Sequence, residues 1–154
     1  MSSYKKPVSV LVVIHTPGPD FQVLLLERTR HPGFWQSVTG SQEADERLVE
    51  TACREVAEET GIAVTAAMIS DWQLINRYEI FAEWRHRYAP GVTENTEHVF
   101  SLCLPATVAV TVAPEEHLGF RWLPWREAAE ACFSWSNRDA ILMLPDHAAR
   151  FRQS

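Results

Sequence analysis

Residues 46–60 constrain the fold most, because they carry a helical pattern with two distinct sides. Apolar or small side chains recur there at three- and four-residue spacing, which gives one stripe that can pack against a core. Gly61 follows directly and supplies a helix stop, and Asp45 is the expected cap at the other end. The stripe consists of Leu48, Val49, Ala52, Val56 and Thr60.

Three carboxylates gather on a neighbouring part of this helix. Glu55, Glu58 and Glu59 stand at positions i, i+3 and i+4, and at about 100° per residue they fall within an arc of roughly 100°. Each like-charge pair costs roughly 0.2–0.5 kcal/mol, so helix stability does not explain them. One interpretation is an acidic face that simply meets water. The other is a site for Mg²⁺, which binds carboxylate oxygens together with waters and phosphates.

The position of the apolar stripe favours the metal site. The stripe lies beside the acidic arc and not opposite it, so the glutamates stand at the edge of the packed face, where a cleft can form. Arg54 precedes Glu58 by four residues and can pair with it.

Composition limits the remaining function classes. A chain of 154 residues that is 46% hydrophobic suits one domain over residues 1–154. The net charge of −6 argues against non-specific nucleic-acid binding. No apolar run approaches the ~20 residues of a membrane helix, and the short polar start does not read as a secretory signal, so we expect a cytoplasmic protein. Three widely spaced cysteines form neither a zinc pattern nor a disulfide framework.

The rest of the chain predicts a mixed sheet with helices on both faces, because strand and helix patterns alternate irregularly and several neighbouring strands look antiparallel. Turn residues between the first two strands suggest a hairpin. We expect Ser136 to cap the last helix. The predicted strands are 8–14, 22–27, 34–38, 71–88, 97–104 and 119–123, and the predicted later helices are 126–133 and 137–144.

The glutamate helix belongs to a longer pattern that resembles the signature of the Nudix family. That signature is Gly, five residues, Glu, seven residues, Arg-Glu, an apolar residue, any residue, Glu-Glu, any residue, Gly and an apolar residue. A match of this length is far more specific than a lone glycine motif. The chain matches at Gly40, Glu46, Arg54, Glu55, Val56, Glu58, Glu59, Gly61 and Ile62.

The resemblance implies an α/β fold of the α+β type, namely an α/β/α sandwich with a mixed sheet and a loop–helix–loop motif. It also implies that the glutamates hold Mg²⁺ or Mn²⁺ against a diphosphate. Glu55 and Glu59 are then the expected direct ligands, with Glu58 next. Glu46 lies about half a turn out of phase with Glu55, so it braces the loop or binds a more distant metal.

In such a site, cations neutralise the diphosphate and activate a water for in-line attack. Members of the family often take the general base from a glutamate on a later loop. Glu116, in the acidic pair after Pro114, is the candidate for that role and for a further metal contact. An exposed loop with no catalytic part is the alternative.

The resemblance extends beyond the signature to one branch of the family. That branch implies removal of pyrophosphate from 7,8-dihydroneopterin triphosphate, leaving the monophosphate, in folate biosynthesis. The segments that carry this similarity are Arg28, residues 34–40, residues 85–91 and residues 135–138.

A pterin is a flat, guanine-like ring on which aromatic side chains can stack. Trp35, Tyr78 and Phe81 are candidate walls, although single aromatics more often pack in the core. Lys5 and Arg28 can meet the triphosphate, with a solvated terminus as the alternative for Lys5. The candidates for hydrogen bonds to phosphate or ring are Thr39 and Ser134.

Two features stay open at this level. The cluster at 85–87 is either a phosphate clamp or an exposed strand face with Arg85 and Arg87 on one side, and we favour the strand. We expect a small-molecule triphosphate as the partner, with no nucleic acid and no membrane, and a monomer or a weak dimer.

Two other functions compete with this prediction. A pyrophosphohydrolase of ordinary or oxidised purine nucleoside triphosphates would use a similar pocket. A non-catalytic nucleotide-sensing module would have lost signature glutamates, and none is lost here.

Overall fold

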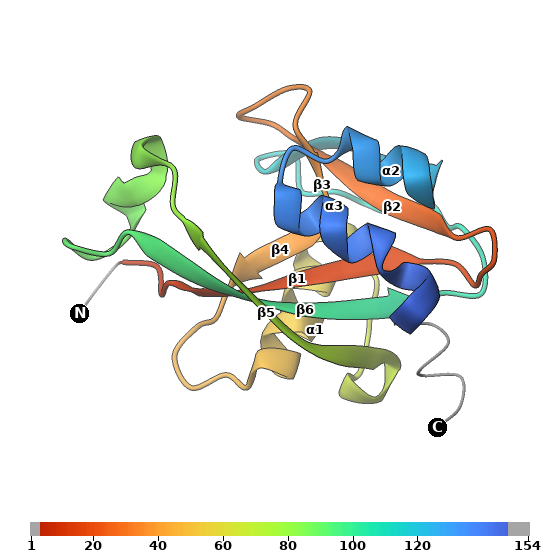
Figure 1. Ribbon diagram of the computed structural model, residues 1–154, viewed down its shortest axis with the longest axis horizontal. Helices are drawn as coiled ribbons and strands as arrows, with labels where there is room; N and C mark the ends of the chain where they lie inside the picture. Colours follow the sequence, from red (N-terminus) through yellow and green to blue (C-terminus); the bar gives the residue numbers. More distant parts are fainter. Residues whose placement is uncertain (1–3, 148–154) are drawn as a thin grey trace.

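The computed structural model describes residues 4–147, which build a seven-stranded mixed sheet (Figure 1). The strands are β1 (Val8–His15), β2 (Gln22–Arg28), β3 (Trp35–Gln36), β4 (Val38–Ser41), β5 (Ile69–Glu79), β6 (Glu94–Cys103) and β7 (His117–Pro124). The helices are α1 (Leu48–Thr60), α2 (Trp125–Ala131) and α3 (Trp135–Leu142), with short 3-10 segments η1 (Ala66–Met68) and η2 (Ala82–Arg87).

The sheet runs in the order β3-β2-β1-β6-β5, with β4 on β1 and β7 on β2. The β1–β6 pair is parallel and joins the two strands along their length, whereas the other pairs are antiparallel. β1 pairs with β2 only at His15 and Val23. Between Ser9 and Val12 its partner on that side is β4. This exchange of partners brings β4 next to the start of β1, where the candidate site lies.

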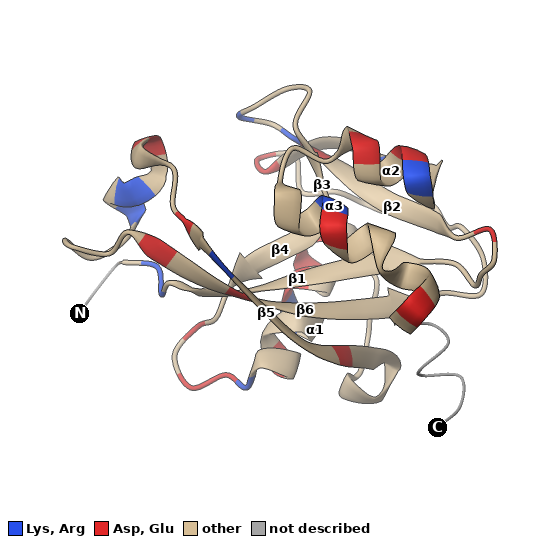
Figure 2. Ribbon diagram, viewed as in Figure 1, with Lys and Arg blue, Asp and Glu red and all other residues tan. Residues whose placement is uncertain are grey.

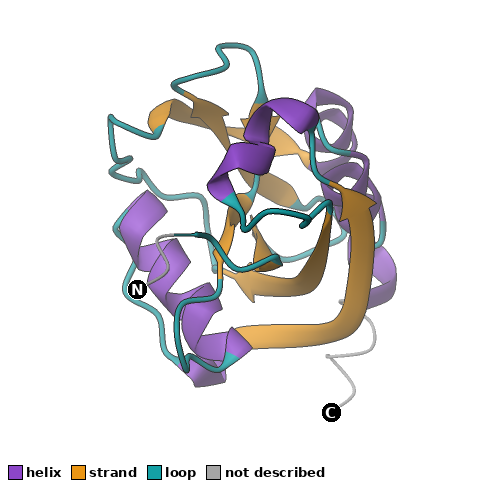
Figure 3. Ribbon diagram, turned by 90° about the vertical axis from the view of Figure 1, so that its left-hand side faces the viewer, coloured by secondary structure: helices purple, strands orange, loops and turns teal. Residues whose placement is uncertain are grey.

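Alternation along β1 divides the interior into two cores. Leu11 and Val13 face the side that α2 and α3 cover, while Val10 and Val12 face α1. Figure 3 shows helices on both faces of the sheet. The predicted α/β/α sandwich with a mixed sheet is therefore confirmed.

Helix α1 forms as its pattern predicts. Ala52 and Val56 are fully buried in the core beneath it. Gly61 ends the helix in the left-handed region at φ 77°, with its N–H bonded to Ala57 O. The start was predicted wrongly, because Arg47 and not Asp45 is the cap residue, and the Glu50 side chain accepts a hydrogen bond from its N–H.

Two further element predictions were wrong. The strand predicted over residues 71–88 ends at Glu79, and η2 follows, because Phe81 and Trp84 sit three residues apart and pack at 5.0 Å between ring centroids. The predicted strand 34–38 divides at Ser37, whose N–H binds Asn137 Oδ1. Smaller shifts affect the later helices, since Ser134 and not Ser136 caps α3.

No helix within residues 4–147 is long and apolar enough to cross a membrane.

Candidate active site

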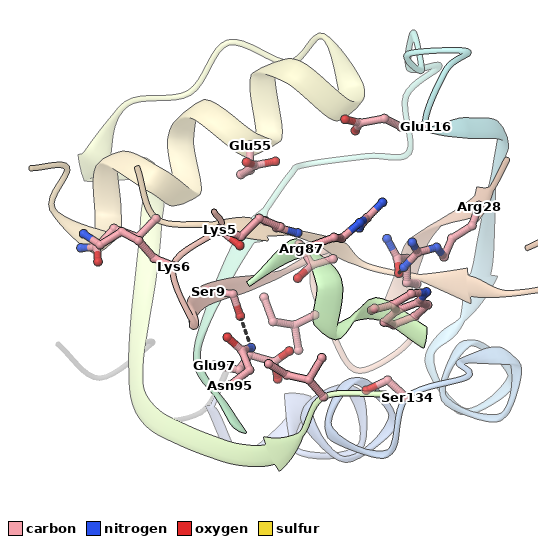
Figure 4. A pocket seen from close by; sticks show the side chains of 18 of the residues that line it. Lys5, Lys6, Ser9, Arg28, Glu55, Arg87, Asn95, Glu97, Glu116 and Ser134 are labelled. Carbon is pink, nitrogen blue, oxygen red and sulfur yellow. Dashed lines mark hydrogen bonds between the residues drawn. The ribbon is translucent and has the colours of Figure 1, made fainter. Parts of the chain in front are cut away.

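A cavity of about 840 Å³ lies between the C-terminal half of α1, η2 and the start of α3. Its charged groups are arranged in sequence (Figure 4). Glu55 and Glu116 lie at one end, and Glu97 lies at the other. Lys5 and Arg87, together with Arg28, lie between them.

Glu59 is the most deeply buried carboxylate of this cavity. Its residue is 1% exposed, and within residues 4–147 neither side-chain oxygen has a hydrogen-bond partner. The nearest imidazole nitrogen, His117 Nε2, is 3.7 Å from its Oε1. Burial and the nearby Arg28 lower the pKa of His117 to about 4, so that ring is neutral at neutral pH. His117 therefore supplies no positive charge to the Glu59 carboxylate.

Glu55 lies next to Glu59, one helical turn earlier. Burial, and then the adjacent Glu55 carboxyl, raise the pKa of Glu59 well above its ordinary value. Burial also raises the pKa of Glu55, although Arg54 opposes the change. A buried carboxyl beside a partly buried one disfavours ionisation of both unless cations compensate them. The pair thus fits a divalent cation.

The remaining coordination positions of that cation do not need protein groups. Within the described residues, no three His, Cys, Asp or Glu side chains form a ready-made metal cage. Mg²⁺ commonly binds one or two carboxylates and fills its other positions with water and substrate phosphate oxygens. Glu55 and Glu59 therefore suffice as a starting donor set.

Gly40 makes room for this pair. A Cβ atom built on Gly40 would overlap the carboxyl group of Glu55. The glycine is required for space and not for backbone conformation, because its φ is not positive. A side chain at position 40 would therefore displace the Glu55 carboxyl group from its place.

Arg54 connects the glutamates of the motif. Its Nε donates to Glu46 Oε2 at 2.6 Å, and its NH1 donates to Glu55 Oε1 at 2.8 Å and to Glu58 Oε2 at 3.2 Å. Its NH2 group donates to Ser41 O at 3.0 Å and so fastens the loop after β4. Arg54 therefore orients the carboxylates, and the half-exposed Glu58 lies at the outer margin.

Glu46 has the bracing role that was one of its two expected roles. It accepts hydrogen bonds from Arg54, from Thr51 Oγ1 at 3.0 Å and from the Glu43 N–H at 2.9 Å. These bonds, above all the one from Arg54, lower the pKa of Glu46 to about 2. The Glu46 carboxylate thus stabilises the loop before α1.

Glu116 faces the cavity from the loop before β7 (Figure 4). Its carbonyl accepts a hydrogen bond from the Thr29 N–H at 2.9 Å, and Thr29 Oγ1 donates to Pro114 O at 2.9 Å. These bonds tie the loop to the end of β2. Glu115 lines the same cavity, so geometry alone leaves both members of the acidic pair within it.

Basic side chains come together from segments far apart in the sequence. The Lys5 N–H donates to Arg87 O at 2.9 Å, which joins the N-terminal segment to η2. Figure 2 shows basic positions gathered where these two segments meet. Burial, and then the adjacent Arg87, lower the pKa of Lys5. An anionic ligand would relieve this crowding of positive charge.

Six of the seven predicted substrate residues line the cavity, and the exception is Trp35. Successive strand residues point to opposite faces, so Gln36 faces the cavity while Trp35 packs on the core beside α2 and α3. The guanidinium of Arg121 covers its ring at 4.9 Å. The six are Lys5, Arg28, Thr39, Tyr78, Phe81 and Ser134.

Thr39 and Ser134, which were expected to bind phosphate or the ring, already have hydrogen bonds within the protein. Thr39 Oγ1 donates to Val10 O at 2.9 Å, and Ser134 Oγ accepts from the Asn137 N–H at 3.4 Å. Their hydroxyl groups therefore also stabilise β4 and the start of α3.

The sequence analysis missed several lining residues. Arg87 was assigned to a strand face, and Trp84 and Phe133 were not singled out, although Arg28 lies 4.8 Å above the Trp84 ring. Asn95 and Glu97 were also missed. Their signal was the alternation of polar residues two apart at the start of this strand, where both side chains are buried and the residues between and after them are partly exposed.

The sandwich fold and the glutamate pair beside Gly40 define a Nudix domain, and the model of that family, described as NUDIX domain, matches residues 5–144. The chain belongs to this family. It is similar to the dihydroneopterin triphosphate diphosphatase of Escherichia coli K12, with 47% identity over 95% of this chain and 97% of the relative. The enzyme of the same name from Haemophilus influenzae is 40% identical over 92% of this chain and 89% of its own length.

A solved structure agrees with these sequence matches. The structure of the E. coli dihydroneopterin triphosphate pyrophosphohydrolase superposes with a TM-score of 0.83 at 48% identity. The match covers 91% of this chain and 95% of that chain.

Proposed function

We propose that this chain hydrolyses 7,8-dihydroneopterin triphosphate to the monophosphate and pyrophosphate, with Mg²⁺ as cofactor and Mn²⁺ as the alternative ion. Nearly full-length relatives at 47% and 40% identity bear the name of this activity. The observation that carries the proposal is the order of groups along the cavity. Carboxylates, then cations, then a buried polar and aromatic end match a metal-bound anhydride, a phosphate chain and a ring.

Glu55 and Glu59 would hold the metal, with Glu58 and Glu116 as further contacts. When bound, the metal neutralises the diphosphate oxygens and lowers the pKa of a water. Its charge would also compensate the buried Glu59 carboxylate beside Glu55, whose oxygens accept no hydrogen bond within residues 4–147.

The other side chains of the site have separate tasks. Arg54 holds Glu55 and Glu58 in place through its NH1 group. Glu116 would accept the proton of the attacking water at its carboxylate. Lys5 and Arg87 would bind the phosphate oxygens that do not contact the metal.

An ordinary or oxidised purine nucleoside triphosphate is the second candidate substrate, because a guanine ring has the same hydrogen-bonding edge as a pterin. A non-catalytic sensing module is disfavoured, since every glutamate of the signature is present and the Glu55–Glu59 pair is buried in the cavity.

A substrate panel tests the proposal. Full-length protein with Mg²⁺ is assayed on dihydroneopterin triphosphate, dATP, dGTP and 8-oxo-dGTP, and the products are identified. We expect the highest kcat/KM on dihydroneopterin triphosphate, with pyrophosphate released in one step. A higher kcat/KM on any of the purine nucleotides would show that this nucleotide, and not dihydroneopterin triphosphate, is the preferred substrate. No Mg²⁺-stimulated turnover of any of the four would overturn the enzymatic assignment.

A further inference from the structure

Two hydrogen-bond acceptors without partners lie at the end of the cavity opposite α1. Glu97 and Asn95 are each 3% exposed, yet Glu97 Oε1 and Asn95 Oδ1 have no hydrogen-bond partner in the part of the chain that the structure describes. The residues are two apart on β6, so their side chains share one face of the strand. Both line the cavity, with Ser134 close to them (Figure 4).

The neighbouring hydrogen bonds determine which atoms remain available. Asn95 Nδ2 donates to Ser9 Oγ at 2.8 Å and to Tyr78 Oη at 3.0 Å. The Tyr78 hydroxyl in turn donates to Glu97 Oε2 at 3.4 Å. The amide nitrogen and one carboxylate oxygen are thus committed, and the free atoms are two acceptors.

Burial of these two acceptors without a ligand destabilises the folded protein. A buried polar atom without a partner loses its hydration without replacement. Burial raises the pKa of Glu97, although the nearby side chains of Ser136, Asn76 and Tyr78 oppose the change. Native proteins rarely keep such atoms unless a ligand or an ion completes them. A ligand that offers two adjacent donors would satisfy both.

We infer that Glu97 and Asn95 bind the 2-amino-4-oxopyrimidine edge of the substrate ring, through its ring N–H and its 2-amino group. This inference rests on the proposed function and adds the residues that read the ring. The edge presents two neighbouring donors, which match the two free acceptors. An adenine edge offers a donor beside an acceptor, so its ring nitrogen would oppose one of these oxygens.

The position of the pair agrees with a single extended ligand. The cations Lys5, Arg28 and Arg87 separate the Glu97 end from the Glu55 end (Figure 4). A ring held at Glu97 would therefore direct its phosphate chain across the cations toward the buried glutamates.

Ring recognition can be measured without phosphates. Neopterin, which lacks phosphate, is titrated into full-length protein with Mg²⁺ present, and binding is followed by its fluorescence. Its 2-oxo analogue replaces the 2-amino donor with an acceptor. We expect neopterin to bind at least about tenfold more tightly than the analogue. Equal affinity for the two, or no binding of neopterin, would overturn the inference.

The variant Glu97→Gln tests whether Glu97 causes the preference for neopterin over its 2-oxo analogue. It should weaken neopterin binding about tenfold or more and reduce the preference over the 2-oxo analogue toward one, because the Gln amide offers a donor to the 2-oxo group. Glu94→Gln is the matched control, since Glu94 is an exposed neighbour on β6 outside the cavity lining. It should retain the wild-type ratio. A wild-type ratio in Glu97→Gln would contradict the assignment.

The two proposals can fail separately. If the protein hydrolyses dihydroneopterin triphosphate but binds neopterin and its 2-oxo analogue equally, only the proposed role of Glu97 and Asn95 is wrong. If the protein binds neopterin selectively but does not hydrolyse dihydroneopterin triphosphate, only the proposed reaction is wrong. The wild-type comparison does not depend on whether any variant folds.

Discussion

The position that a Cβ atom would take on Gly40 coincides with the carboxyl group of Glu55. The glycine of the signature and its second glutamate therefore form one steric unit, although they lie on different elements. β4 contributes the space and α1 contributes the carboxylate. This relationship explains why a strand residue without a side chain belongs to a catalytic motif.

Gly40→Ala should lower kcat by about tenfold or more with a smaller effect on folding, because the new methyl displaces the Glu55 carboxylate from its place. Steady-state kinetics with saturating Mg²⁺ measures the change. Gly119→Ala is the control, since nothing lies within 4 Å of its added Cβ. A similar loss in both variants would contradict the steric explanation.

Glu55→Gln should reduce turnover by about two orders of magnitude or more, because it removes one anionic ligand of the metal. Urea unfolding of the metal-free protein should change little or show a gain, since the substitution removes one of two adjacent buried carboxylates. Near-normal kcat at saturating Mg²⁺ would exclude Glu55 as a ligand.

Glu116→Gln should slow turnover by about a hundredfold, which is the lower range for loss of a general base. The Mg²⁺ concentration that gives half-maximal rate should rise only slightly, because Glu55 and Glu59 remain as the main ligands. Glu115→Gln provides the comparison, because its carboxylate neighbours Glu116 in the same loop and cavity. A larger loss in Glu115→Gln would transfer the role of base to that residue.

Glu46→Gln tests the brace by its pH dependence. The pKa of Glu46 in the folded protein is about 2, below its ordinary value of 4.5, so its charge stabilises the fold above pH 4.5 and that contribution is lost as the pH falls toward 2. The variant should be less stable by about 1–3 kcal/mol at pH 7, with a smaller difference at pH 3. Urea unfolding at both pH values gives the two differences.

The control for this brace is Glu43→Gln, whose carboxylate is 68% exposed and 3.6 Å from Arg54. An exposed pair of this kind contributes little, so we expect a small change at either pH. A difference for Glu46→Gln that stays constant from pH 7 to pH 3 would show that its charge is not what holds the loop.

Local periodicity explains which features the sequence could predict. The stripe containing Ala52 and Val56 and the arc containing Glu55 and Glu59 depend only on helix geometry, and the structure places both as expected. The α/β/α layers follow from the same kind of pattern. The resemblance to the Nudix signature predicted a metal-dependent hydrolase, and the match to the family model agrees with this resemblance.

The features that the sequence did not reveal depend on tertiary packing. The wrong assignment of Trp35 arose because alternation cannot tell which face of a two-residue strand borders a cavity. Arg87 was missed because contacts between Phe81 and Trp84 end β5 early and turn the chain into η2. Glu97 was missed because alternation along β6 can indicate an inward acidic side chain but cannot show that one of its oxygens lacks a hydrogen-bond partner within residues 4–147.

A thermal unfolding titration with Mg²⁺ tests the central claim most directly, namely that buried Glu55 and Glu59 carboxylates are completed by a divalent cation. The Tm of the wild-type protein should rise with Mg²⁺ concentration. Glu59→Gln should be at least as stable as the wild type without metal and should show little or no rise. Equal Mg²⁺-dependent increases in the two proteins would contradict the account.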